Sequence, residues 1–277
     1  MMLSVKRSFF FACVSVLFIT ACKKDKIKGP VPADEYIETV PAVQTGIGVK
    51  INDAIGGFYA ALPSYYNQTT KNYPLLVSLH GAGQSGNGNT QLPFLANDGV
   101  AKVIAEKRFP PNFVVNGKNY SFIVLSPQFS KYPGVTEVES FIQYAKKKYR
   151  IDASRIYITG LSMGGYVSSD MGAAYPKELA AIVPMAGVSE SGDLKVKSAA
   201  IAKNNLPVWY FNNNNDPSVP VSNVTHFVSL INANNPAIKP KTTIFDGTGH
   251  DCWTKGTDPN YKEDGMNIYE WMLQYKR

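Results

Sequence analysis

The segment Gly160-Leu161-Ser162-Met163-Gly164-Gly165, of the form Gly-x-Ser-x-Gly, most constrains what this chain can fold into. It follows an apolar run at residues 156–158, typical of a buried strand, and it opens a helical stretch that reaches about Tyr175. A sharp strand-to-helix turn needs glycines beside the serine because the backbone there comes very close to itself. The segment therefore predicts an exposed serine hydroxyl at the edge of a sheet, near the positive end of a helix.

The rest of the chain alternates strand-like and helix-like segments. An antiparallel hairpin is expected at 46–50 and 58–66, further strands at 75–79, 122–125, 156–158, 181–185, 208–211 and 242–245, and further helices at 92–107, 135–149, 221–232 and 266–275. This alternation indicates βαβ units, and therefore a mostly parallel sheet with helices on both faces. In such a sheet, ligands bind at the carboxyl ends of the strands.

Three histidines occur in the chain, and one of them stands where a base for Ser162 is needed. His250 lies in residues 247–251, a loop after the last expected strand, and therefore at the carboxyl edge of the sheet. Because a serine hydroxyl is a weak nucleophile without a neighbouring base, we expect His250 to take its proton. His80 is expected to order the loop that it begins, and His226 falls within an expected helix as a surface or packing residue.

A carboxylate is needed beside the histidine to fix its tautomer and to stabilise its cation. Asp216 lies in a proline-bearing turn directly after an expected strand, and it is the predicted acid. The interval from Asp216 to His250 leaves room for one helix and one strand. The rival acids are Asp193, which comes one strand too early, and Asp246, which adjoins the loop of His250.

A glycine-rich loop, His80-Gly81-Ala82-Gly83, follows the expected strand at 75–79. Acyl transfer develops negative charge on the carbonyl oxygen, and losing one N–H donor aimed at that oxygen typically costs ~3 kcal/mol. The candidate donors of this oxyanion hole are the amides of Ala82 and Met163. A phosphate-binding loop would also be rich in glycine, but no Gly-Lys-Ser/Thr sequence accompanies this one.

These residues together resemble a known group of proteins. Residues 149–165, 79–83, 216–220 and 249–253 are similar to motifs of secreted esterases, a group that includes dienelactone hydrolases, polyhydroxybutyrate depolymerases and feruloyl esterases. The likeness spans about Leu75 to the C-terminus. It implies the α/β-hydrolase fold, with its triad in the chain order serine, acid, histidine, and hydrolysis of carboxylic esters without a metal or cofactor.

The sequence departs from the pattern of that group at two places. Relatives often carry Glu-Arg-Gly after the oxyanion loop, where this chain has Gln84-Ser85-Gly86. Relatives often carry His-Gly after the strand that precedes the acid, where this chain has Asn212-Asn213. Both places are expected near the cleft, so family analogy does not define the substrate.

The beginning of the chain is typical of an export signal. Lys6 and Arg7 precede an apolar stretch at 9–21, which is shorter than the ~20 residues that a membrane span needs. The stretch ends in Ile19-Thr20-Ala21-Cys22, which resembles the lipobox of bacterial lipoproteins and implies cleavage before Cys22 and acylation of its thiol. The alternative is a secretory signal with a coincidental cysteine.

The expected organisation is therefore a lipoprotein signal peptide at 1–21, a tether at 22–45 and a catalytic domain at 46–277. The lysines and prolines of the tether are typical of a solvated spacer, and they also resemble the surface-export signals of some bacterial lipoproteins. The expected location is a bacterial membrane, at the outer membrane or the cell surface, with the lipid anchor on Cys22.

Charge and composition limit the classes of partner that the chain is expected to bind. The formal net charge is +7, but the basic residues are spread along the chain and form no dense stripe, so no nucleic-acid partner is expected. Trp253, Phe129, Tyr132 and Tyr261 are candidates to line the substrate cleft. An acylated plant polysaccharide suits an esterase on a cell surface, and the alternatives are a prolyl-oligopeptidase-like serine peptidase and a catalytically silent glycan-binding lipoprotein.

Overall fold

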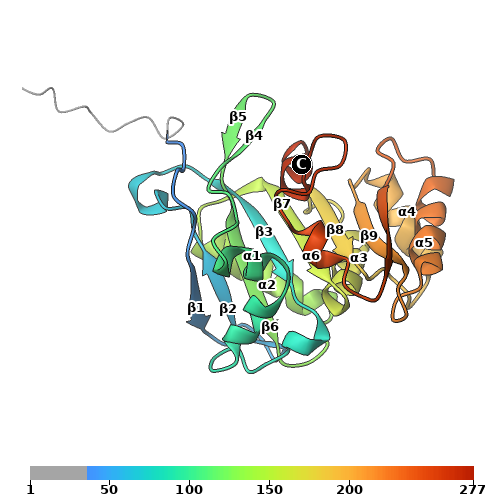
Figure 1. The fold of residues 1–277 in the computed structure, drawn as a ribbon, viewed down its shortest axis with the longest axis horizontal. Helices are drawn as coiled ribbons and strands as arrows, with labels where there is room; N and C mark the ends of the chain where they lie inside the picture. The colour runs from blue at the N-terminus through green and yellow to red at the C-terminus, as the bar shows by residue number, and fades with distance from the viewer. Residues whose placement is uncertain (1–35) are drawn as a thin grey trace, which may run out of the picture. The chain divides into compact units, whose positions relative to one another are not determined.

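The computed structural model describes residues 36–277, and a sheet of eight strands carries their fold (Figure 1). The strand order is β1-β2-β6-β3-β7-β8-β9-β10. The pairs β1–β2 and β2–β6 are antiparallel, and every later pair is parallel. The predicted signal peptide, the acylation site Cys22 and the tether up to residue 35 lie outside the described residues.

The elements have the following bounds. The strands are β1 (Gln44–Gly48), β2 (Ile55–Ala61), β3 (Tyr73–Leu79), β4 (Phe113–Val115), β5 (Lys118–Tyr120), β6 (Ile123–Phe129), β7 (Ile151–Leu161), β8 (Ala181–Met185), β9 (Trp209–Asn215) and β10 (Lys241–Thr248). The α-helices are α1 (Gly99–Ala105), α2 (Val135–Lys148), α3 (Met163–Ala174), α4 (Leu194–Lys203), α5 (Val221–Ala233), α6 (Trp253–Gly256) and α7 (Ile268–Leu273). Short 3-10 helices are η2 (Tyr66–Gln68), η3 (Ala82–Gln84) and η4 (Leu92–Asn97).

Two apolar cores lie on opposite faces of the sheet, because successive residues of a buried strand point to opposite sides. Leu75, Val77 and Leu79 of β3 belong to the core that α2, α3, α4 and α5 cover. Leu76, between them, belongs to the core that α1 and α7 cover. The predicted mostly parallel sheet with helices on both faces is therefore confirmed.

Strand β6 is longer than the sequence indicated, because it continues through Pro127 instead of ending before it. Pro127 has no N–H to give to a neighbouring strand. The parallel pairing of β6 with β3 ends at Leu125, whereas Pro127 is paired only with Phe58 of β2. The proline therefore stands where β6 has parted from one of its two neighbours.

The helix expected over residues 92–107 is two pieces, η4 and α1, separated at Asp98. Gly99 has a φ of +64°, and a Cβ there would lie 2.8 Å from Leu161 Cδ2. The chain therefore turns at this glycine instead of continuing as one helix. The break places Asp98 where its carboxylate accepts a hydrogen bond from the indole N–H of Trp253, a residue close in the chain to His250.

The β4–β5 hairpin and the helices α4 and α6 were absent from the sequence-based expectation. The β4–β5 hairpin turns at Asn116 and Gly117, both at positive φ, which is the signature of a tight Asn-Gly turn. Helix α4 follows Asp193, whose carboxylate caps it by accepting from two backbone amides. Helix α6 is a single turn. Among residues 36–277, no helix has the length and apolar character needed to cross a bilayer.

Candidate active site

Ser162 stands at a sharp turn between β7 and α3. Its φ of 51° lies in the left-handed region that residues with a Cβ rarely adopt. A Cβ at Gly160 would lie 2.2 Å from the carbonyl oxygen of Gly164, and a Cβ at Gly164 would lie 2.2 Å from that of Leu79. The amide of Ser162 donates to the carbonyl of Met185 at 2.9 Å. The turn therefore requires glycine on both sides of the serine.

Ser162, His250 and Asp216 form a continuous series of hydrogen bonds, although 88 residues separate the first two along the chain. The Ser162 Oγ and His250 Nε2 atoms are 2.8 Å apart, and His250 Nδ1 and Asp216 Oδ2 are 2.8 Å apart. An ionised carboxylate only accepts, so Nδ1–H donates to Asp216, and Nε2 is left to accept from the serine hydroxyl. The structure thus brings the three predicted catalytic residues together.

Asp216 is held from both sides of its carboxylate. Its Oδ1 accepts from the amides of Ser218 and Val219, at 2.8 and 3.0 Å, while Oδ2 faces the histidine. Its side chain has no exposed surface, whereas a quarter of the His250 side chain is exposed. Asp216 is therefore fixed in the interior, and His250 reaches the surface beside Ser162.

The two predicted oxyanion donors each open a helix. Met163 is the first residue of α3 and Ala82 is the first of η3, so neither N–H has an acceptor within its own helix. The turns that carry them are in direct contact, since a Cβ at Gly81 would lie 2.7 Å from Leu161 Cδ1. Both amides therefore remain candidates to bind a developing oxyanion.

His80 orders the loop that carries Ala82. Its Nε2 accepts from the amide of Phe129 at 2.8 Å, so its Nδ1 carries the proton and donates to the carbonyl of Gly81 at 2.6 Å. Burial lowers the pKa of His80 to about 4, and the ring stays neutral at physiological pH. It makes no hydrogen bond to Ser162, which agrees with a structural role.

The first departure from the family pattern also fastens this loop. The Gln84 side-chain oxygen accepts from the amide of Gly81 at 2.9 Å, and its NH₂ group donates to the carbonyl of Leu95 at 3.3 Å. The Gln128 side chain donates to the Gln84 carbonyl at 3.0 Å. A glutamate at position 84 would lose the donor to Leu95, since a carboxylate only accepts.

The second departure holds the base, and sequence reasoning missed its role. Strand β9 runs through the asparagines to Asn215. Asn213 is almost fully buried, and its NH₂ group donates to the carbonyl of Gly249, the residue before His250, at 2.8 Å. The neighbouring Asn214 side chain accepts from the amide of Gly247 at 3.3 Å. The break in the family pattern at Asn212-Asn213 was the available signal.

The residues predicted to line the substrate cleft have different surroundings. Trp253 stands edge-on to the His250 ring, with centroids 5.1 Å apart, and its indole N–H donates to Asp98 at 3.2 Å. Tyr132 is exposed. Phe129 was placed wrongly: it is completely buried against the ring of His80, so its side chain offers a substrate no surface. Tyr261 packs edge-to-face on Phe245.

The rival acids are occupied elsewhere. Asp193 caps α4. Asp246 lies on β10, two residues before the strand ends at Thr248. Its carboxylate accepts from the Asn214 side chain at 3.1 Å. His226 lies on α5, as expected, away from the serine hydroxyl that His250 contacts. Of the candidates considered, Asp216 is the carboxylate bonded to His250.

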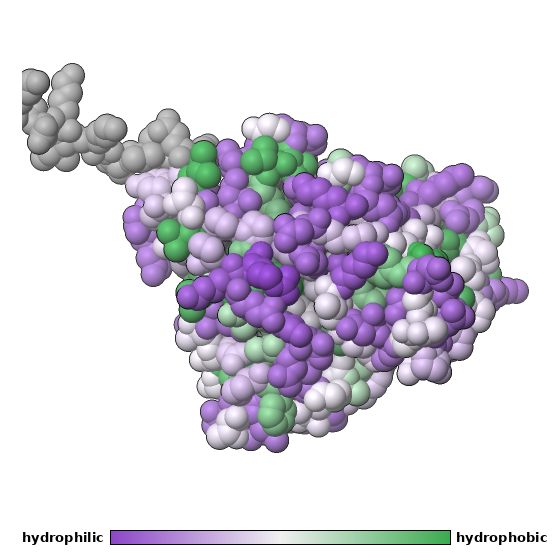
Figure 2. All heavy atoms as spheres, in the orientation of Figure 1, coloured by the Kyte–Doolittle hydropathy of each residue, from purple (hydrophilic) through white to green (hydrophobic). Residues whose placement is uncertain are grey.

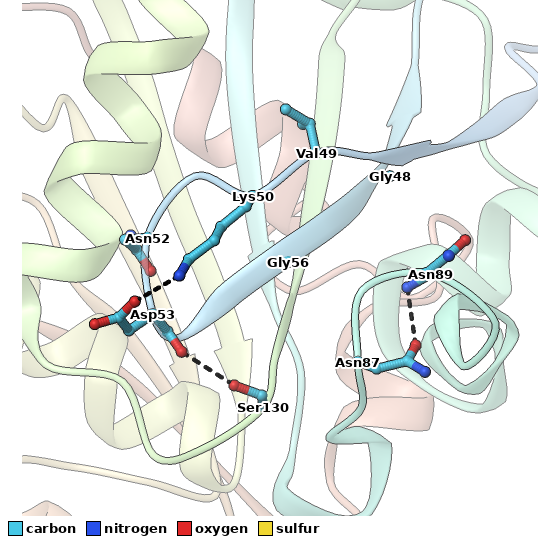
Figure 3. A pocket seen from close by; sticks show the side chains of 9 residues that line it. All are labelled: Gly48, Val49, Lys50, Asn52, Asp53, Gly56, Asn87, Asn89 and Ser130. Carbon is cyan, nitrogen blue, oxygen red and sulfur yellow. Dashed lines mark hydrogen bonds and ion pairs between the residues drawn. The ribbon is translucent and has the colours of Figure 1, made fainter.

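A polar hollow of about 480 Å³ lies between the β1–β2 hairpin and the segment 87–89 (Figure 3). Lys50 and Asp53 form an ion pair on one side of it, and the Ser130 hydroxyl donates to the Asp53 carbonyl. Its polar groups therefore bond to one another, and no residue of the Ser162 series lines it. This hollow is separate from the candidate active site.

With this geometry in hand, comparison with known proteins defines the family. A family model described as phospholipase/carboxylesterase matches residues 63–258, which is most of the chain. The chain belongs to the phospholipase/carboxylesterase family of α/β-hydrolases. The resemblance to secreted esterases noted in the sequence is thereby confirmed at the level of the family.

Two curated relatives are similar to parts of this chain. A poly(3-hydroxyalkanoate) depolymerase of Paucimonas lemoignei is 30% identical over 118 residues, which are 42% of this chain and 28% of the relative. A bifunctional acetylxylan esterase/xylanase of Neocallimastix patriciarum is 28% identical over 203 residues, 72% of this chain and 26% of the relative. The chain thus spans about a quarter of the length of the curated relatives that it matches.

Solved structures share the fold. A thermostable esterase has a TM-score of 0.58 at 24% identity, covering 86% of this chain and 64% of that one. The feruloyl esterase module from Clostridium thermocellum, in complex with sinapinate, has a TM-score of 0.51 at 15% identity, covering 80% and 87%. A dienelactone hydrolase from Klebsiella pneumoniae has a TM-score of 0.52 at 14% identity, covering 84% and 95%.

Proposed function

We propose that this protein hydrolyses carboxylic esters through an acyl-enzyme, with Ser162 as nucleophile, His250 as base and Asp216 as the carboxylate that orients the base. The observation that carries the proposal is the pair of 2.8 Å contacts that join Ser162 to His250 and His250 to Asp216. The positive φ of Ser162 supports it further, because strain of this kind gathers at functional sites.

In the proposed mechanism, Ser162 Oγ attacks the ester carbonyl while His250 Nε2 takes its proton. The amides of Ala82 and Met163 donate to the oxyanion of the tetrahedral intermediate. Asp216 stabilises the imidazolium, which then protonates the leaving alcohol. Water, deprotonated by His250, attacks the acyl-enzyme, and the carboxylic acid leaves as Ser162 regains its proton.

An acylated polysaccharide is the proposed substrate. The name of one relative includes acetylxylan esterase, and one solved neighbour is a feruloyl esterase module. The surface favours a soluble chain over a solid polyester, which would need a continuous apolar patch. On the face drawn in Figure 2, hydrophobic residues form separate patches among hydrophilic ones. Among residues 36–277, the exposed large apolar side chains Ile37, Val40 and Val43 lie in the segment before β1, and the others stand apart on different elements or loops: Phe94, Val114, Tyr132, Val196 and Ile244.

A serine peptidase is the alternative, and the fold also resembles that of an acylaminoacyl peptidase, with a TM-score of 0.50 at 14% identity. This chain covers only 38% of that one. A second alternative, a silent glycan-binding protein, would not need a serine, a histidine and a carboxylate held within hydrogen-bonding distance. Each alternative predicts a different result from ours when the protein is tested by fluorophosphonate labelling and by turnover of ester and peptide substrates.

The experiment compares the full chain with Ser162→Ala by fluorophosphonate labelling and by turnover of p-nitrophenyl acetate. We expect the wild type to label and to turn over, and the variant to do neither while melting at a similar temperature. Acetylated xylan and feruloylated oligosaccharide are then tested beside a peptide p-nitroanilide. A folded wild type that neither labels nor turns over ester contradicts the proposal, and a preference for the anilide favours the peptidase.

We also propose export with a lipid anchor on Cys22, which rests on the sequence around that residue. Metabolic labelling of the producing bacterium with an alkynyl fatty acid tests it. Label is expected on the wild type and not on Cys22→Ser. Equal labelling of the two, or none on either, contradicts the anchor without touching the esterase proposal.

A further inference from the structure

A hollow of about 380 Å³ lies at the same edge of the sheet as the proposed nucleophile. Tyr132 follows β6, Tyr166 stands in the first turn of α3, and Glu190 and Ser191 follow β8. All of them therefore come from the carboxyl ends of strands. The amide of Tyr166 donates to the carbonyl of Ser162 at 3.0 Å, so its ring is one helical turn from the nucleophile.

Tyr132 gives this hollow an aromatic face. Its side chain is 61% exposed, which is unusual for so large a ring, and Phe94 is the other strongly exposed aromatic among the described residues. Partial loss of contact with water, together with the negative charges of Asp170 and Glu190, raises the pKa of Tyr132 although most of its ring is exposed. The ring thus presents apolar surface to solvent while its hydroxyl stands in the field of two carboxylates.

The two carboxylates in the hollow differ. Asp170 is balanced by Lys197, whose Nζ lies 2.6 Å away. Glu190 forms no ion pair within the described part of the chain. Its Oε1 accepts from the Tyr166 hydroxyl at 3.1 Å and from the Asn223 amide at 2.6 Å, which leaves Oε2 to accept from a ligand.

Glu190 also links this hollow to a second one of about 460 Å³, which Ser222, Asn223 and His226 line. The polar wall therefore continues from Glu190 onto α5, as a chain of sugars would require. Side chains that accept and donate hydrogen bonds beside an exposed ring are the combination that fits a sugar, with its hydroxyl rim and its less polar face.

We propose that this hollow is a subsite for a neutral pyranose of the substrate's carbohydrate part, stacked on Tyr132 and hydrogen-bonded through a hydroxyl to Glu190. The subsite rests on the proposed ester hydrolysis at Ser162. Because no described cation neutralises Glu190, its charge accepts a sugar hydroxyl but repels a uronate. The site therefore selects esters of neutral polysaccharides over those of pectic, acidic ones.

The first test measures kcat and KM of the full chain with acetylated xylohexaose and with p-nitrophenyl acetate. In Tyr132→Ala we expect KM for the oligosaccharide to rise roughly tenfold, as for loss of one aromatic contact, with kcat little changed. Turnover of p-nitrophenyl acetate stays at the wild-type value because that ester has no sugar. Tyr132→Phe keeps the ring and is expected to behave as the wild type.

The second test addresses the charge. In Glu190→Gln we expect kcat/KM for acetylated oligogalacturonate, divided by that for acetylated xylohexaose, to rise several-fold. Asp193→Asn is the matched control, because it removes an exposed negative charge three residues away while asparagine still caps α4. An equal rise in both variants would mean a general charge effect and would overturn the role of Glu190.

The outcomes separate the subsite from the esterase proposal. If the wild type hydrolyses p-nitrophenyl acetate but not acetylated xylohexaose, or if Tyr132→Ala leaves KM for the oligosaccharide unchanged, the subsite is wrong and the esterase stands. If the wild type hydrolyses neither ester and does not react with fluorophosphonate, the proposed function fails first. A raised KM in Tyr132→Ala that Tyr132→Phe does not show supports the subsite.

Discussion

The two halves of the candidate site are held in different ways. The nucleophile half consists of the turn at Ser162 and the strand end that it packs against, where backbone lies so close to backbone that Gly160 and Gly164 have no room for a Cβ. The base half consists of the loops of Asp216 and His250, which side-chain amides of the β9 asparagines fasten by hydrogen bonds. Steric exclusion fixes the nucleophile half. Hydrogen bonds fix the base half, and other residue types could supply the same donors.

This difference leads us to expect two kinds of damage. A side chain added at a glycine of the nucleophile half forces backbone apart, so folding and activity fail together. A change in the base half removes an orienting bond but leaves the packing intact, so activity falls while the protein stays folded. Four substitutions test whether the halves separate in this way.

The largest effect on rate is expected from Asp216→Asn. Asparagine keeps an oxygen for the amides of Ser218 and Val219, but it favours the wrong tautomer of His250, so kcat is expected to fall by about 10⁴. Melting temperature should change little, and both quantities are measured on the same preparation. Asp246→Asn is the control and should keep kcat within a few-fold, and a comparable loss there would move the acid's role to Asp246.

The largest effect on folding is expected from Gly164→Ala. The added Cβ would lie 2.2 Å from the carbonyl oxygen of Leu79, which cannot move without displacing β3. We expect the free energy of unfolding in urea to fall by about 3 kcal/mol or more, with loss of activity. Gly83→Ala is the control, since nothing lies within 4 Å of its added Cβ, and its stability should stay near the wild type. Equal stabilities for the two variants would contradict the steric argument.

His80 makes the nucleophile half sensitive to acid. Its pKa is lowered by burial from 6.5 to about 4, so the unfolded chain binds a proton more readily than the folded one. Stability from this group is therefore complete above pH 6.5 and is lost as pH falls toward 4, by about 3 kcal/mol in all. Protonation would also place an N–H at His80 Nε2, where it would face the amide N–H of Phe129, so two donors would oppose each other. Unfolding in urea from pH 7 to pH 4 should show a steeper decline in the wild type than in His80→Gln, and parallel declines would refute this assignment.

The smallest effect is expected from Asn213→Ala, which removes the bond to the carbonyl of Gly249. We expect kcat with p-nitrophenyl acetate to fall about tenfold, the equivalent of ~1.4 kcal/mol, because His250 is held less well. Asn213→Gln should recover part of the rate if its amide reaches Gly249. Asn214→Ala loses two longer and more exposed bonds, to the amide of Gly247 and to Asp246, and as the control it should cost less. A loss of stability without a loss of kcat would mean that Asn213 is structural only.

The sequence predicted the nucleophile half better than the base half, for a physical reason. Glycines and a serine at fixed spacing are the visible result of steric exclusion, so the turn at Ser162 and its strand and helix were predicted correctly. The bonds from Asn213 to Gly249 and from Gln84 to Leu95 join residues distant in the chain through interchangeable amides, and no local pattern reports them. The burial of Phe129 was missed because its position after a strand predicts an edge and not the tertiary contact with His80.

The backbone conformation of Ser162 makes stability and activity compete at this residue. A residue with a Cβ at φ 51° carries strain of roughly 1–3 kcal/mol, whereas glycine adopts that conformation freely. A population of sequences chosen only for resistance to heat would therefore be expected to drift toward glycine at position 162 and to lose the hydroxyl. Serine would persist at this position only under selection for activity. The residue that makes the chain most stable at position 162 and the residue that makes it active are therefore different.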